Sequence, residues 1–143
     1  LKGEAAISAW MDANAVAFKG VTDADIREAL GGLIGDADKK ALDGVIADEY
    51  ATATRKGLAV SFDGWIDDDI AFIQPWGFEL SEIKVPVKIW QGDQDLMVPH
   101  AHSYWLEKHI PTGELRFIQG HGHLSLIADY KVEIIEQARE LLK

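Results

Sequence analysis

The sequence predicts an α/β protein in which a helical region, residues 1–74, precedes a strand–helix–strand–helix region, residues 75–143. Two observations lead to this prediction. The spacing of apolar residues changes from helical to strand-like between Pro75 and Pro86. The charge is also uneven, because residues 1–81 hold 15 of the 24 acidic side chains but only 7 of the 14 basic ones. We therefore expect an acidic helical region followed by a parallel α/β region.

The composition narrows the class of protein. With 143 residues, of which 48% are hydrophobic and 27% charged, the chain is long enough to bury a core. A net charge of −10 argues against nucleic acid and anionic lipid as partners. No apolar run approaches the roughly 18 residues that a membrane span needs, and the chain has no cysteine. We therefore predict a cytoplasmic protein without a membrane partner, a disulfide or a thiol nucleophile.

Four helices are expected in the first region, each from apolar residues at helical spacing. They cover Glu4–Phe18, Asp23–Leu33, a stretch from Asp36 through Leu42, Val45, Ile46 and Tyr50, and Trp65–Ile73. Gly20 ends the first helix, and Thr22 is the expected N-cap of the second. Gly57 ends the third and Pro75 the fourth, because proline cannot continue a helix.

The second region alternates short apolar runs with helical patterns. Strands are expected at Val85–Trp90 and Leu115–Ile118, and helices at Pro99–His109 and from Leu124 to the end of the chain. The last helix carries one apolar stripe, formed by Ile127, Tyr130, Ile134, Ala138 and Leu141. A strand, a crossover helix and a second strand normally form a right-handed parallel unit.

Acidic and histidine side chains follow the two strands. Asp93 and Asp95 come after the first strand, and His121 and His123 come after the second. Because the carboxyl ends of parallel strands meet at one edge of a sheet, we expect these four side chains to converge there. A carboxylate beside an imidazole fixes the tautomer of the ring, so that its other nitrogen can take a proton from a nucleophile in acyl transfer.

The residues around these positions form a familiar pair of motifs. Gly92-x-x-Asp95-x-x-Val98-Pro99, followed by Ile118-x-Gly120-x-Gly122-His123, resembles the acid turn and the histidine loop that end the α/β-hydrolase fold. The resemblance implies that Asp95 is the acid and His123 the base of a catalytic triad, whereas Asp93 and His121 hold non-catalytic positions.

The resemblance also implies an architecture and an activity. Residues 75–143 would be the C-terminal part of the hydrolase core, and residues 1–74 a helical lid before it. The expected activity is hydrolysis of an ester, an amide or a related bond of a small molecule, with no cofactor and no metal.

The nucleophile of such a triad is missing from the sequence. No Gly-x-Ser-x-Gly elbow is present, and none of the five serines stands between suitably placed glycines. The chain also begins with Leu1 rather than with methionine. We therefore expect the C-terminal fragment of a longer hydrolase, inactive alone, whose missing N-terminal half supplies a serine or aspartate nucleophile. The unpaired strand edges also predict self-association or pairing with that half.

Aromatic residues near the junction of the two regions are candidates for substrate binding. Trp65, Trp76 and Phe78 are expected to line an apolar pocket, whereas Phe72 is interpreted as a residue of the lid core.

Other interpretations of the same residues stay open. Asp95 alone can cap the helix that begins near Pro99, and His123 can be satisfied by backbone. The chain can also be a catalytically inactive hydrolase-fold module for binding or interaction. A third interpretation is a metal-dependent hydrolase that adds His100 and His102 as ligands. It is disfavoured because residues two apart on a helix point in different directions.

Overall fold

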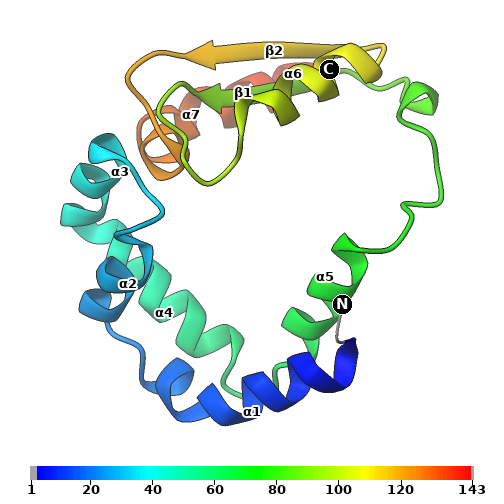
Figure 1. The fold of residues 1–143 in the computed structure, drawn as a ribbon. Coiled ribbons are helices and arrows are strands. Elements are labelled where there is room, and N and C mark those ends of the chain that lie inside the picture. Colours follow the sequence, from blue (N-terminus) through cyan, green and yellow to red (C-terminus); the bar gives the residue numbers. More distant parts are fainter. Residues whose placement is uncertain (1–2, 143) are drawn as a thin grey trace. The chain divides into compact units, whose positions relative to one another are not determined.

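The computed structural model describes residues 3–142 and contains α-helices with two parallel strands (Figure 1). The elements in chain order are α1 (Glu4–Gly20), α2 (Asp23–Leu30), α3 (Asp36–Ala41), the π-helix η1 (Leu42–Ile46), α4 (Ala47–Gly57), α5 (Asp63–Phe72), the 3₁₀-helix η2 (Leu80–Glu82), β1 (Val87–Gly92), α6 (His100–His109), β2 (Gly113–Ile118) and α7 (His123–Leu141). The predicted α/β class and the order of helices before strands are confirmed.

Local sequence signals set several of the helix ends. Helix α1 ends at Gly20, as predicted. At the start of α2 the Thr22 hydroxyl accepts a hydrogen bond from the Asp25 amide (3.3 Å), and Asp25 Oδ2 accepts one from the Thr22 amide (2.8 Å). This reciprocal pair satisfies two amides at the helix start, so the predicted cap is confirmed. Helix α2 ends at Leu30, three residues before its predicted end, and residues 31–33 form a turn.

The third predicted helix is interrupted by a π-turn. The expected apolar face of this stretch is buried at Leu42 and partly buried at Ile46, but it is wrong at Val45, which is 70% exposed, and at Tyr50, which is 44% exposed. The buried positions are instead Ala47 and Ala51. A π-turn adds one residue to a helical turn, so it rotates the following residues and brings a different set to the interior.

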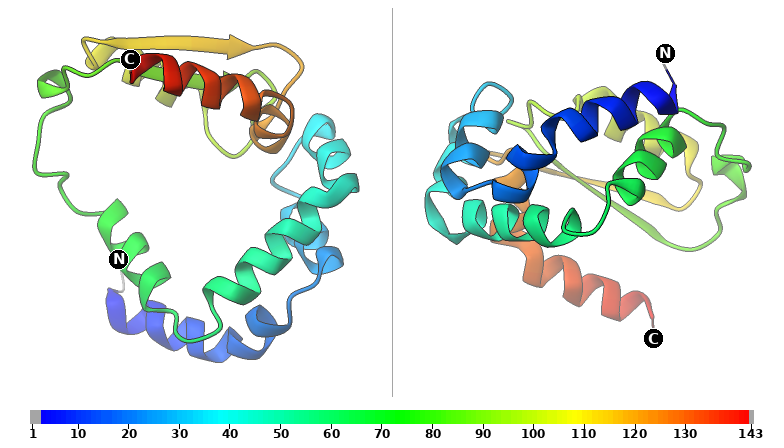
Figure 2. Two further views of the ribbon diagram at one scale, coloured as in Figure 1. Left: turned by 180° about the vertical axis from the view of Figure 1, so that it is seen from behind. Right: turned by 90° about the horizontal axis from the view of Figure 1, so that it is seen from below.

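The described chain divides into two compact units. The first consists of residues 3–26 and 47–77, in which α1 packs against α4 and α5 (Figure 2). Its core is a cluster of buried side chains: Met11, Leu58, Phe62 and Ile66. Phe72 is 81% exposed, so its interpretation as a core residue is wrong. It is the last residue of α5, and Ile66 one to two turns earlier fills the core in its place.

The second unit consists of residues 27–46 and 78–142 and contains both strands. Strands β1 and β2 pair in parallel, with Val87 opposite Gly113 and Gly92 opposite Ile118. Helices α6 and α7 cover opposite faces of this pair (Figures 1 and 2). Tyr104 of α6 stacks on Phe117 (ring centroids 5.7 Å apart), whereas Tyr130 of α7 contacts Trp90 on the other face (5.6 Å).

Strand β1 begins two residues later than predicted, and it extends to Gly92. Val85 is 67% exposed, and Pro86 has no amide hydrogen to donate to a ladder. The predicted strand–helix–strand–helix order is otherwise confirmed.

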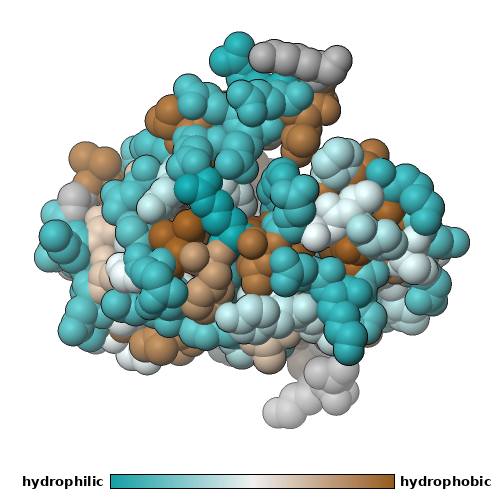
Figure 3. All heavy atoms as spheres, turned by 90° about the horizontal axis from the view of Figure 1, so that it is seen from above, coloured by the Kyte–Doolittle hydropathy of each residue, from teal (hydrophilic) through white to brown (hydrophobic). Residues whose placement is uncertain are grey.

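The apolar stripe predicted on α7 is partly buried at Tyr130 and Ile134 and exposed at its other positions. The buried residues are those of the first turn, Leu124, Ser125 and Leu126, whereas Ile127 is 56% and Leu141 43% exposed. The two strands, of six residues each, are roughly 20 Å long and cannot cover the whole of a 19-residue helix, which is roughly 28 Å long. Hydrophobic residues also interrupt the hydrophilic surface in Figure 3. None of the helices in residues 3–142 combines the length and apolarity that a bilayer crossing requires.

Candidate active site

The loops that follow the two strands lie against each other. The Gln94 amide donates to the His121 carbonyl oxygen (2.8 Å), and the Gly120 amide donates to Asp93 Oδ1 (2.7 Å). A side chain at Gly92 would place its Cβ 2.2 Å from the His121 carbonyl oxygen, which no structure tolerates without movement of the backbone. Glycine at the end of β1 therefore permits the close approach of the two loops.

This approach brings Asp95 and His123 into contact. Asp95 Oδ2 lies 3.0 Å from His123 Nδ1, although the two residues are 28 positions apart. The Asp95 side chain is only 7% exposed, whereas that of His123 is 40% exposed. The carboxylate is thus held inside the unit while the imidazole reaches the surface, an arrangement suited to a group that transfers protons to a bound molecule.

Asp95 is held by donors from its own loop. Its Oδ1 accepts hydrogen bonds from the amides of Met97 and Val98 (both 2.9 Å), and Oδ2 accepts one from Nε2 of the buried Gln91 (3.2 Å). Helix α6 begins at His100 without a side-chain cap, so the alternative interpretation of Asp95 as the cap of that helix is wrong. Gln91 was not singled out from the sequence, although a polar side chain at the end of an apolar strand is a usable signal.

These contacts set the pKa of Asp95. Partial burial raises the pKa, but the hydrogen bonds from the Val98 amide, the His123 ring and the Met97 amide outweigh it, and the net pKa lies below the ordinary value. The group is therefore a carboxylate near neutral pH.

The ionised carboxylate determines the role of each His123 nitrogen. A carboxylate can only accept hydrogen bonds, so Nδ1 must carry the proton that lies between the two side chains. In the neutral ring Nε2 is then the nitrogen with a lone pair, and it can accept a proton from a nucleophile. Because the ring is satisfied by the Asp95 side chain, the alternative of a histidine satisfied by backbone is wrong.

His121 forms a different kind of pair. Its Nε2 lies 3.1 Å from Asp129 Oδ2, and its Nδ1 lies 2.9 Å from the Gln119 carbonyl oxygen. Both nitrogens therefore face acceptors, and neither is placed to take a proton from a nucleophile. Asp93, the other acidic residue after β1, bonds to the Gly120 amide and joins the two loops.

A buried carboxylate that the sequence analysis did not identify is bonded to the backbone at His123. Asp38 of α3 is fully buried, and its two oxygens accept hydrogen bonds from the amides of His123, Leu124 and Ser125 (2.9–3.0 Å) and from the Ser125 hydroxyl (2.8 Å). It thus caps the N-terminus of α7 from a position 85 residues earlier in the chain. No local pattern in the sequence could reveal a cap supplied from such a distance.

The three aromatic residues expected at the substrate pocket lie in different units. Trp65 packs against Phe18 in the first unit (ring centroids 5.2 Å apart), and Trp76 belongs to the same unit. Phe78 belongs to the unit that holds Asp95 and His123. Their side chains are 37–56% exposed, and their role in substrate binding stays a prediction.

The residues considered for a metal do not form a ligand cluster. Within residues 3–142 no group of three or more histidine, aspartate or glutamate side chains is placed to hold a metal ion. The His100 ring instead lies edge-on to Phe117, with centroids 5.0 Å apart, and its Nε2 is buried with no hydrogen-bond partner in the described chain.

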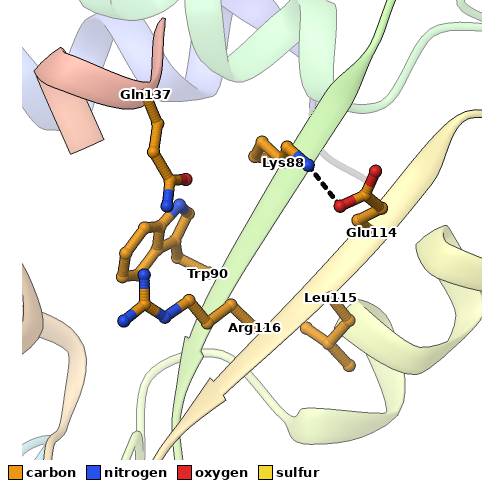
Figure 4. Close-up of a pocket in the computed structure, with 6 residues that line it drawn as sticks. All are labelled: Lys88, Trp90, Glu114, Leu115, Arg116 and Gln137. Carbon is orange, nitrogen blue, oxygen red and sulfur yellow. Dashed lines mark hydrogen bonds and ion pairs between the residues drawn. The ribbon is translucent and has the colours of Figure 1, made fainter. Parts of the chain in front are cut away.

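A cavity of about 250 Å³ lies on the α7 side of the strands (Figure 4). Its cationic side chains are already paired, because Arg116 contacts Glu133 and lies 4.4 Å from the Trp90 ring, and Lys88 contacts Glu114. The cavity therefore offers little to an anionic ligand, and it lies apart from the edge of the sheet where Asp95 and His123 meet.

Comparison with protein-family models found no match for this chain, and comparison with curated proteins found none either.

Proposed function

We propose that this chain provides the acid and the base of an α/β-hydrolase that cleaves an ester, an amide or a related bond of a small molecule. Asp95 orients His123 and stabilises the imidazolium that forms when the ring takes up a proton. His123 acts first as general base toward the nucleophile and then as general acid toward the leaving group. The observation that carries the proposal is the 3.0 Å contact between the buried carboxylate and the half-exposed ring.

The nucleophile in this proposal comes from outside the 143 residues. Three serine hydroxyls donate elsewhere: that of Ser8 to the Glu4 carbonyl, that of Ser103 to the His100 carbonyl, and that of Ser125 to Asp38. The partner that supplies the nucleophile would be the N-terminal half of the hydrolase core. In the described residues β1 and β2 pair only with each other, which leaves an edge on each for further strands.

The test compares the two histidines in the complete hydrolase that the proposal requires, with p-nitrophenyl acetate as substrate. We expect His123→Ala to lower kcat/KM by roughly 10⁴-fold or more, since removal of a triad member has effects of this size. His121→Ala is the matched control, and it should lower kcat/KM by less than about tenfold because neither of its nitrogens faces a nucleophile.

Three outcomes would contradict the proposal. Equal losses in the two variants would mean that His123 is not the base. No turnover by the complete protein would favour the alternative of a non-catalytic binding module. Burst kinetics from the 143 residues alone would place the nucleophile within this chain.

A further inference from the structure

The carboxylate of Asp38 is bonded to the backbone of the proposed base. Oδ2 accepts from the His123 amide (2.9 Å), while Oδ1 accepts from the amides of Leu124 (3.0 Å) and Ser125 (2.9 Å) and from the Ser125 hydroxyl (2.8 Å). An ionised group buried to 0% exposure is costly unless it is fully satisfied. Here all four donors belong to the first turn of α7, where the helix dipole also favours negative charge.

The neighbouring chain is shaped to receive this carboxylate. A Cβ at Gly122 would lie 2.4–2.5 Å from the carboxylate atoms of Asp38, so a side chain there would displace the group. The Ser125 hydroxyl also accepts a hydrogen bond from the Gly122 amide (2.8 Å) and donates one to Asp38 Oδ1. Gly122 therefore leaves room for the Asp38 carboxylate, and the His123 amide donates to it.

We propose that Asp38 is a positioning residue for His123: by holding the first turn of α7, it sets where the imidazole meets Asp95. The proposal rests on the proposed function of His123 as the base. It gives α3, which the sequence groups with the lid, a direct part in the geometry of the site. Two carboxylates then fix one residue, Asp38 through the backbone and Asp95 through the ring.

The variant Asp38→Asn distinguishes a role of Asp38 in positioning His123 from a role in the stability of the fold. A side-chain amide has only one acceptor oxygen. The orientation of this amide that keeps the bonds to Leu124 and Ser125 turns its NH₂ group toward the backbone amide of His123. Two donors then face each other, and the bond to His123 is lost. Ser125→Ala is the matched control, because it removes two hydrogen bonds of the same cap and leaves the bond between Asp38 and His123 in place.

The readout is ¹⁵N and ¹H NMR of the His123 ring in the 143-residue chain at about pH 8, which lies above the ordinary pKa of a free imidazole. We expect Asp38→Asn to weaken or remove the downfield signal of the Nδ1 proton bonded to Asp95, and to shift the tautomer ratio seen in the ¹⁵N shifts. Ser125→Ala should keep both signals at their wild-type positions. Wild-type His123 signals in folded Asp38→Asn would overturn the proposal, and so would equal changes in the two variants.

A second variant covers the case in which Asp38→Asn does not fold. Asp38→Glu keeps the charge and both oxygens, so the cap survives, but the extra methylene displaces the first turn of α7. A displaced Nδ1 signal in this variant supports positioning, and an unchanged one overturns it.

In the complete hydrolase, Asp38→Asn should lower kcat by up to about 10²-fold with KM unchanged, as expected for a misplaced catalytic group. The two proposals fail separately. If His123→Ala leaves turnover intact, the proposed function is wrong whatever the NMR shows. If His123→Ala is inactive but the Nδ1 proton signal is unchanged in Asp38→Asn, only the positioning role of Asp38 is wrong.

Discussion

Two histidines that follow β2 each pair with a carboxylate, and the two pairs differ in burial and in hydrogen bonding. His123 pairs with Asp95 from the loop after β1, whereas His121 pairs with Asp129 of α7. In the first, Asp95 is 7% exposed and accepts from Met97, Val98 and Gln91 as well as from His123. In the second, the Asp129 side chain is 67% exposed, and the carboxylate bonds to His121. The same two residue types thus form a fixed pair at one position and a surface pair at the other.

The difference shows what a histidine–aspartate contact needs if it is to transfer protons, as we propose for His123. A carboxylate held by several donors keeps its place when the ring changes charge, and its low exposure strengthens the interaction. An exposed carboxylate is screened by solvent and contributes little. The position of the ring matters as well, because His123 lies at the start of α7 on a backbone held by Asp38, whereas His121 lies in the preceding loop.

The largest effect is expected from a change that separates the loops that follow β1 and β2. Gly92→Ala would place a methyl group 2.2 Å from the His121 carbonyl oxygen, so the backbone must move, and we expect a loss of about 3 kcal/mol in the free energy of unfolding. Gly64→Ala is the control, because this glycine lies in α5 with nothing within 4 Å of an added Cβ. It should stabilise the chain by roughly 0.5–1 kcal/mol. Urea unfolding followed by circular dichroism measures both. A neutral Gly92→Ala would contradict the close approach of the loops.

A smaller effect is expected when the two carboxylates are compared directly. Asp95→Ala leaves the Met97 and Val98 amides without their acceptor and removes one of the three acceptors near Gln91 Nε2, and we expect it to cost roughly 2 kcal/mol. Asp129→Ala removes one exposed contact and should cost no more than about 0.5 kcal/mol. The same urea titrations measure both values. Equal costs would mean that the two pairs do not differ in the way described.

The sequence predicted the pair of loops well because general rules of topology determine it. A parallel strand–helix–strand unit places both strand ends at one edge, and the turn residues after each strand could be read directly. The contact between Asp95 and His123 could therefore be predicted from strand pairing alone, without knowledge of any other long-range contact.

The hydrogen bonds between Asp38 and the first turn of α7 could not be predicted in this way. Asp38 bonds to residues 85 or more positions later, and its neighbours in α3 carry no sign of that partner. The extra residue in the π-turn after α3 likewise leaves no signal in the apolar spacing, and it moved the buried face from Val45 to Ala47 and Ala51. Local patterns report local structure, and contacts between distant segments depend on how the whole unit packs.

The smallest effect is the pH dependence of the stability that Asp95 contributes. Because the pKa of Asp95 in the folded chain lies below its unfolded value, the folded state binds fewer protons near pH 4, and stability rises with pH there. The contribution of Asp95 is therefore complete above the unfolded pKa, about 4, and is lost as the pH falls through the lower folded pKa. The difference in unfolding free energy between the wild type and Asp95→Asn should shrink as the pH falls below about 4. Urea titrations at several pH values measure this difference. A difference for Asp95→Asn that does not change below pH 4 would show that its hydrogen bonds do not depend on the charge of the carboxylate.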